Sequence, residues 1–483
     1  MIRWPSPRCL VLALTLATAL PGPGAAQTPA PDPAPSGTPM PPPTRTAPPM
    51  PTREPLPAPP GIRPFATPQE LVGRELTIEE AVNIGMENAP KIVARIGDYL
   101  AAQQRVNQAL APLLPQLTGS GSYGRARSVN SISGSPFTGD FGSASVTASQ
   151  LLFDFGRTWA AKDVAKSSAE ALKEVLEAQK LDISQLVKTQ YYTLLLSKRL
   201  VEVNVTALER AEVNLRSAQG FFQVGTQPKS FVTRAEVDVA NGRVNVIRAQ
   251  NAVSLARVAL NTAMGIAVNA ATEVKDLLAY QQFAMDRNAL VAEAIRNRPE
   301  YRQVKSQAEA ADAFVRQTFR DFFPNLFGSG TYGVTGVTGA PAFNSRSTSG
   351  FVESGNEWSV GLSLSWSIFD GGGKIARYKE AKANLEAAQA RVRDAELQVW
   401  QSVEQSYLNL GEAEERIGAA GKAVESAEEN YQLARGRFDA GVANIIELTD
   451  AQLALTQAQS TEAQALSDYR IAIANLERAL GRR

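Results

Sequence analysis

Residues 359–373 read SVGLSLSWSIFDGGG and decide how the chain folds. In the first ten positions apolar side chains alternate without a break with serine and glycine, which is typical of a strand with one apolar face. Trp358 and Trp366 share that apolar face, about 27 Å apart along a strand and roughly 20 Å apart after a tilt of about 40°. Aromatic residues that close both ends of an apolar band are typical of outer-membrane barrel strands, although a half-buried strand of a soluble sandwich also alternates.

Three further segments favour an outer-membrane barrel over a soluble sandwich. Residues 117–125, 143–153 and 326–334 are similar in length, rich in glycine and serine, and paired by turn-rich loops. Four strands cannot close a barrel, and an open sheet edge cannot face lipid, so we expect the chain to oligomerise. Two copies would give eight strands with a nearly filled interior, so a conduit needs at least three copies and twelve strands.

The junction that follows the strand occurs twice in the chain. IFDGG at 368–372 follows LFDFG at 152–156 by 216 positions, and this offset holds without insertion to the end of the repeat. Upstream the offset is 209, as in PQLTGSGSYG from Pro115 and PNLFGSGTYG from Pro324, so seven extra residues follow Tyr332. A unit this long is not a solenoid repeat. We expect two similar halves, at 71–265 and 286–481, joined by a linker at 266–285.

Each half reads as helix, helix, strand, strand, long helix, helix. The long helices are expected at 157–222 and 374–437, where apolar residues recur at helical spacing without proline, and each would be roughly 100 Å long. Shorter partners are expected at 229–264 and 445–480, and a helix at 91–110 could stack end to end on the first of them. The fold class is therefore α+β, with barrel strands continued by a long helical coiled-coil barrel.

Composition excludes several functions. The chain has 49 basic and 48 acidic residues, which gives no long-range attraction to nucleic acid. It has no histidine, and its single cysteine, Cys9, lies in an expected signal peptide at 1–26. We therefore expect no enzyme activity, metal or cofactor. A proline-rich spacer at 27–70 precedes the fold, which begins where Thr77 and Glu80 have the spacing of a helix capping box.

From the first helix onward, the sequence resembles the TolC family of outer-membrane efflux and secretion ducts. The resemblance rests on the two half-repeats, the junctions QLLFDFGR from Gln150 and SWSIFDGGG from Ser365, and the segments FQVGTQPKSFVTRAE from Phe222 and FDAGVANIIELTDAQLAL from Phe438. It implies a homotrimer in outer-membrane lipid, with a helical barrel that projects into the periplasm. It also implies a periplasmic adaptor protein and an inner-membrane transporter of the RND, ABC or MFS class as partners.

The resemblance also assigns roles at the ends of the helical hairpins. Turns at Val224, Gly225 and Thr226, extending to Gln227, and at Gly441, Val442 and Ala443, extending to Asn444, are expected to contact the adaptor. Glycine suits the left-handed backbone of such turns.

Glu447 and Asp450 share a helical face and match acidic residues that line the constriction in the family, although acids are common in any first helical turn. Three copies would give a ring of six carboxylates that favours cations. The family closes the mouth with an acid and a base, but this chain has Phe231 and Ala443 there, so we expect closure by apolar packing at Phe231.

Two other functions remain open from the sequence. A passive porin explains the strands but gives no reason for helices of about 100 Å. A soluble periplasmic coiled-coil scaffold explains the helices but leaves the strand bounded by tryptophans unexplained.

Overall fold

The computed structural model describes residues 75–129, 136–276, 278, 280, 287–337 and 353–483. All of them fall within one unit, Arg63–Arg483. The expected signal peptide, the spacer and part of the linker lie outside the described residues.

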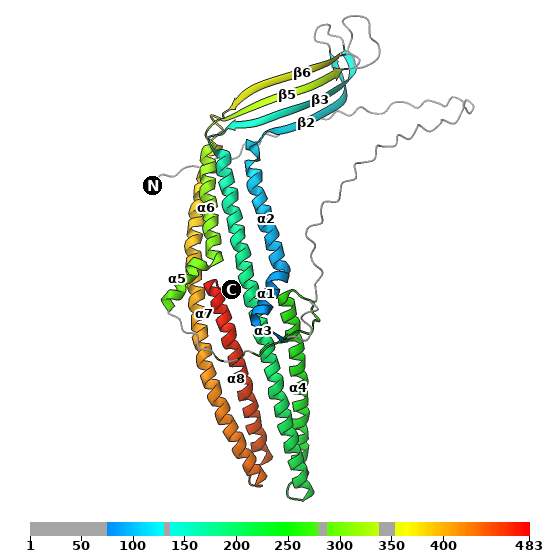
Figure 1. The fold of residues 1–483 in the computed structure, drawn as a ribbon, viewed down its shortest axis with the longest axis vertical. Helices are drawn as coiled ribbons and strands as arrows, with labels where there is room; N and C mark the ends of the chain where they lie inside the picture. Colours follow the sequence, from blue (N-terminus) through cyan, green and yellow to red (C-terminus); the bar gives the residue numbers. More distant parts are fainter. Residues whose placement is uncertain (1–74, 130–135, 277, 279, 281–286, 338–352) are drawn as a thin grey trace, which may run out of the picture. The chain divides into compact units, whose positions relative to one another are not determined.

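The two halves have the same order of elements, as the sequence predicts (Figure 1). The first half contains α1 (Ile78–Asn88), α2 (Pro90–Leu110), β2 (Gln116–Val129), β3 (Pro136–Phe153), α3 (Arg157–Gln223) and α4 (Lys229–Met264). The second half contains α5 (Arg287–Asn297), α6 (Pro299–Arg320), β5 (Asn325–Val337), β6 (Glu353–Ser365), α7 (Gly373–Asp439) and α8 (Ile445–Leu480). Two short strands, β1 (Glu75–Leu76) and β4 (Glu273–Val274), pair in parallel, and a 3₁₀ turn, η2 (Ala111–Leu113), follows α2. None of the helices among the described residues combines the length and the apolar character that a membrane crossing requires.

The four long strands form one antiparallel sheet in the order β2-β3-β5-β6 (Figure 1). The two hairpins have the same register: Ser120 pairs with Ser145 in the first, and Ser329 pairs with Gly361 in the second. The offsets of 209 and 216 convert one pair into the other. The register therefore places the seven extra residues of the second half within 338–352, outside the described residues.

The strand that carries the two tryptophans differs from the sequence-based expectation at both ends. β6 begins at Glu353 and ends at Ser365, so Trp358 lies within it opposite Tyr332, but Trp366 follows it. The Trp366 indole N–H donates to the Phe322 carbonyl at 3.0 Å, at the junction with α6. The strand thus ends three residues before the expected Ile368, whereas the place of Trp366 at the end of the apolar band stays a prediction. The chain already turns toward α7 at this point, and the Asp370 carboxylate accepts from the Lys374 backbone N–H at 2.8 Å.

Each short helical partner abuts the beginning of another helix, as expected for α4 and α2. Gly265 ends α4 with φ of +69°, and a Cβ atom there would lie 2.7 Å from the Asn88 carbonyl oxygen. Gly481 ends α8 in the same way with φ of +76°, and a Cβ atom there would lie 3.0 Å from the Asn297 carbonyl. These two glycines let α4 and α8 continue the lines of α2 and α6 along the long helices.

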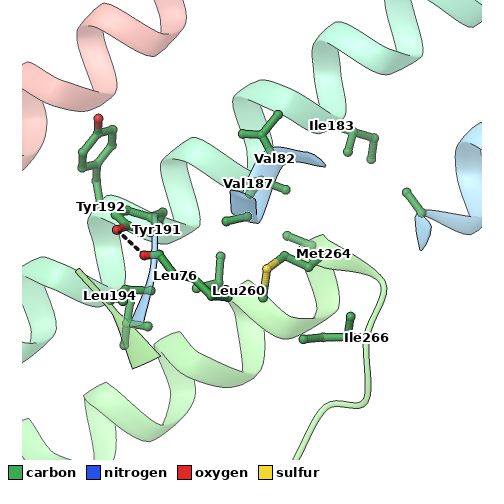
Figure 2. Packing of buried hydrophobic residues seen from close by; sticks show 14 of the residues in the cluster. Leu76, Val82, Ile183, Val187, Tyr191, Tyr192, Leu194, Leu260, Met264 and Ile266 are labelled. Atoms are coloured by element: carbon green, nitrogen blue, oxygen red, sulfur yellow. Dashed lines mark hydrogen bonds between the residues drawn. The ribbon is translucent and has the colours of Figure 1, made fainter. Parts of the chain in front are cut away.

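Among the described residues, the largest buried cluster lies where the end of α4 and the beginning of α2 meet on α3 (Figure 2). Tyr191 from α3 is fully buried there, and its hydroxyl contacts the backbone oxygens of Leu76 at 2.9 Å and Lys275 at 2.8 Å. Burial raises the pKa of Tyr191, so the hydroxyl stays protonated and can donate. A separate cluster, which we call the tip cluster, joins the far ends of the two helical hairpins.

Candidate functional site at the helical tips

The two hairpin turns have the same backbone geometry. Gly225 and Gly441 both have φ of +75°, the left-handed backbone expected there. In both turns the residue after the glycine donates its N–H back to a helix carbonyl at 3.0 Å, from Thr226 to Phe221 and from Val442 to Arg437. This pattern is a Schellman motif, which satisfies carbonyls that the helix end leaves without partners.

The outermost side chains of the turns are apolar and exposed. Val224 is 72% exposed and Val442 is 70% exposed, which is unusual for valine. Each tip therefore exposes one valine, directly before the glycine in the first turn and directly after it in the second.

The beginning of α8 carries the two acidic residues that the sequence singled out. The Asn444 side chain accepts from the Ile446 N–H at 3.2 Å and caps the helix, so Glu447 and Asp450 lie in the first turns and are exposed. Glu447 forms an ion pair of 2.9 Å with Arg437 at the end of α7. The positive charge of Arg437 therefore offsets Glu447.

Sequence reasoning missed Arg437, although a signal was available. Arg437 stands where the first half has Phe221, so it adds a charge to only one of the two tips.

Phe231 and Ala443 do not stand apart at the mouth but pack on the tip cluster. The buried members of this cluster come from all four tip helices: Ala218, Ala235, Tyr431, Ala434, Phe438, Ile445, Leu448, Ala451 and Leu455. Phe221 from α3 and Phe438 from α7 meet edge to face with ring centroids 5.6 Å apart. The cluster therefore holds the α3–α4 hairpin against the α7–α8 hairpin within one chain.

Three side-chain hydrogen bonds also connect the hairpins. Thr449 donates to Asp238 at 3.1 Å, and the Asn214 amide donates to Gln452 at 2.7 Å. The Gln452 amide in turn donates to the Ala207 carbonyl at 2.8 Å. No repeat or motif in the sequence indicated these contacts, because they join α8 to residues more than 200 positions away.

At the opposite end of α3 and α7, the sheet exposes one apolar face. Trp358, Val360 and Leu362 on β6 and Tyr332 on β5 are all more than half exposed. A patch of this kind requires lipid or another protein surface to cover it. The other face carries hydroxyl pairs, which bond across strands at 2.8 to 3.2 Å: Ser120 with Ser145, Ser122 with Ser143, and Thr147 with Thr331.

Sequence comparison identifies the family. The profile of the outer membrane efflux protein family matches residues 84–266 and 290–482, which is more than half of the chain. The outer membrane protein TolC of Escherichia coli is 25% identical over 404 residues, covering 81% of this chain and 79% of TolC. The alkaline protease secretion protein AprF of Pseudomonas aeruginosa is 25% identical over 427 residues, covering 83% of each chain.

Solved structures confirm the fold class. The outer-membrane channel OprN superposes with a TM-score of 0.72 at 21% identity, covering 84% of this chain and 89% of OprN. The outer membrane protein VceC of Vibrio cholerae gives a TM-score of 0.70 at 20% identity, covering 84% of this chain and 96% of VceC. The family resemblance inferred from the two half-repeats is thus confirmed, and this chain belongs to the outer membrane efflux protein family.

Proposed function

We propose that the chain is the outer-membrane exit duct of a tripartite efflux or type I secretion system, and that it works as a homotrimer. The observation that carries this proposal is the four-stranded sheet. Among the described residues the outer edges of β2 and β6 have no partner strand, and one face of the sheet is apolar and exposed. The apolar face suits lipid, but the unpaired backbone groups of the two edges are not stable in a membrane unless further strands close the sheet.

The helices extend the proposed duct on the periplasmic side. α3 and α7 each have 67 residues, or about 100 Å at the rise of an α-helix. A passive porin needs no such extension, and a soluble scaffold needs no exposed apolar sheet. Three copies would supply twelve strands, enough for a barrel with an open interior.

The helical tips are the proposed entrance. Glu447 and Asp450 would face the constriction, and the tip cluster with Phe231 would keep the hairpins together when the entrance is closed. The exposed Val224 and Val442 tips would contact a periplasmic adaptor protein, which in turn joins an inner-membrane RND, ABC or MFS transporter. Two relatives are named for different cargo, alkaline protease secretion and pyoverdine export, which supports a duct that does not itself select its cargo.

Reconstitution tests this function. The mature protein, extracted in detergent, should run as a trimer by light scattering and form small, cation-selective channels in a planar bilayer. Protein that stays soluble without detergent and forms no channel would favour the scaffold. Large channels that are permanently open in both the intact protein and a variant without the helical tips would favour the porin.

A further inference from the structure

The exposed apolar face of the sheet becomes charged along β2. On this strand the face begins at Leu117 and reaches Tyr123, which are 75% and 73% exposed. The next two residues of the same face are Arg125 and Arg127, because side chains two positions apart on a strand point the same way. The register of β2 with β3 is continuous over the whole strand, so no bulge interrupts this order.

Cross-strand pairs identify this face as the one that would contact lipid. Residues directly opposite each other in a sheet share a face. One such row crosses all four strands: Gly119, Val146, Tyr332 and Trp358. The two arginines lie an even number of positions from Gly119, so they share the face of Trp358. The serine hydroxyl pairs of β2 occupy the other face.

The arginines follow the apolar band, toward the end of β2 that is farther from the helices (Figure 1). At about 3.4 Å per residue, Arg125 follows Tyr123 by about 7 Å and Arg127 follows it by about 14 Å. A strand tilt of about 40° reduces these separations to heights of roughly 5 and 10 Å. Because the helices project into the periplasm, these heights correspond to the lipid headgroups on the cell-surface side of the membrane.

Both guanidinium groups have hydrogen-bond donors available for a ligand. The Arg125 Nε atom lies 3.6 Å from Asp140 Oδ1, which is beyond a good hydrogen bond, and the Arg125 side chain is 74% exposed. Arg127 is exposed opposite Thr138, and no ion pair joins it to another residue that the structure describes. The chain therefore satisfies neither guanidinium fully.

Charged residues at this end of the sheet are divided between its two faces. Glu357 precedes Trp358 on β6, so it points to the polar face, away from the arginines. On the arginine face, the positions that lie beyond the rings of β5 and β6 are uncharged: Val334, Gly336 and Asn356. Among the described side chains, Asp140 is the one acid beside the arginines, so two positive charges face one negative charge.

We propose that Arg125 and Arg127, which we call the arginine pair, bind phosphate groups of lipids in the cell-surface leaflet of the outer membrane. A guanidinium group suits phosphate because its N–H donors can bond two oxygens at once. Basic residues at a membrane surface also attract anionic headgroups. The ring of Tyr123 would contact the same lipid at the depth where aromatic residues are enriched in barrels.

This inference rests on the proposed duct for the orientation of the sheet in the membrane. It adds a ligand that the passage of cargo does not require. Pairing of strands between copies would use the backbone edges of β2 and β6, so the arginine pair would remain on the lipid side in the trimer.

Lipid retention by the purified protein tests the site. The probe is lipid A with two phosphate groups, added in detergent with divalent cations chelated, and native mass spectrometry measures how much stays bound. Arg125→Gln/Arg127→Gln should weaken binding roughly tenfold, since each arginine near an anionic surface contributes about fivefold and Asp140 offsets part of this. Equal retention of lipid A and its dephosphorylated form by the unmodified protein would overturn the proposal.

A matched control removes the same charge elsewhere. Arg243 and Arg248 are exposed on α4, and Arg243 pairs with Glu212 at 3.5 Å, much as Arg125 does with Asp140. Arg243→Gln/Arg248→Gln should retain lipid A as the unmodified protein does. An equal loss of lipid in this control would show that net charge, rather than the arginine pair, governs retention.

A third variant should change binding in the opposite direction. Asp140→Asn removes the negative charge beside Arg125, so it should tighten lipid A binding several-fold. Damage to the sheet would weaken binding instead, so this result separates recognition from a loss of structure. Unchanged or weaker binding by Asp140→Asn would contradict the proposed role of the arginine pair.

The outcomes separate this inference from the proposed function. Unmodified protein that forms channels but shows no preference for the phosphorylated lipid would retain the duct and reject the site. Unmodified protein that stays soluble without detergent and forms no channel would reject both.

Discussion

At the scale of single residues, the charge at the entrance is smaller than the sequence suggests. Glu447 and Asp450 predict a strongly acidic tip, but Arg437 neutralises the first of them. We therefore expect Asp450→Ala to lower cation selectivity more than Glu447→Ala does. Arg437→Ala should raise it, and each change should be about two- to fivefold because exposed charges interact by about 1 kcal/mol or less. Reversal potentials in a salt gradient measure this, and equal effects of both acid variants would contradict it.

A second residue links stability to pH. Glu273 accepts from Lys198 at 2.5 Å and from Arg257 at 2.8 Å, and these contacts hold its pKa below its ordinary value of 4.5. A carboxyl with a depressed folded-state pKa stabilises the fold above its unfolded pKa, and this contribution is lost as the pH falls through the folded pKa. Glu273→Gln should thus melt below the wild type at pH 7 by circular dichroism, with the gap closing below about pH 4. A gap that does not narrow as the pH falls below about 4 would refute the assignment.

At the scale of elements, the tip cluster should act as a latch between the hairpins. Leu448 is 1% exposed within it, so Leu448→Ala should weaken the contact by about 2–5 kcal/mol and increase the open time of single channels. Leu453→Ala, on the same helix but 68% exposed, is the matched control and should behave as wild type. Similar open times of Leu448→Ala and wild type would show that the entrance opens without separation of the hairpins.

The end-to-end stacking of α4 on α2 can be tested by comparing Gly265, which lies at this junction, with Gly441, which lies in a hairpin turn. Gly265→Ala and Gly441→Ala both place a side chain at positive φ, which costs about 1–2 kcal/mol. Only at Gly265 would the new Cβ also meet backbone, at 2.7 Å, whereas nothing lies within 4 Å of it at Gly441. Gly265→Ala should therefore lower the melting temperature clearly more than Gly441→Ala. Equal losses would mean that the helix ends separate at little cost.

Long elements were predictable from the sequence because a repeat and a helical period fix them. The bounds of α4 and α8 agree with the expected 229–264 and 445–480. The end of β6 was not predictable, because alternation continues through Trp366 and Ile368 after the backbone has left the sheet. The tip contacts through Arg437 and Gln452 depend on tertiary packing, which a periodic pattern does not record.

At the scale of the whole molecule, the association of the copies should respond to salt differently from the ion pairs within each chain. Screening at about 1 M NaCl weakens ion pairs at partly exposed positions such as Glu174–Arg302 but leaves apolar contacts intact. The trimer fraction in detergent should therefore be the same at low and high salt when measured by light scattering. Loss of trimer at high salt would indicate that charged groups hold the copies together.

The two hairpins share one register although their sequences have diverged, and this has an evolutionary consequence. An ancestral half-length chain could have built the same ring from six identical subunits, in which any mutation appears six times. After fusion of two such genes, corresponding positions in the two halves can mutate independently of each other. The boundary inside each chain and the boundary between chains could then diverge, and one tip could gain Arg437 while the other kept Phe221. Duplication thus exchanged sixfold for threefold symmetry and doubled the number of surfaces on which selection can act.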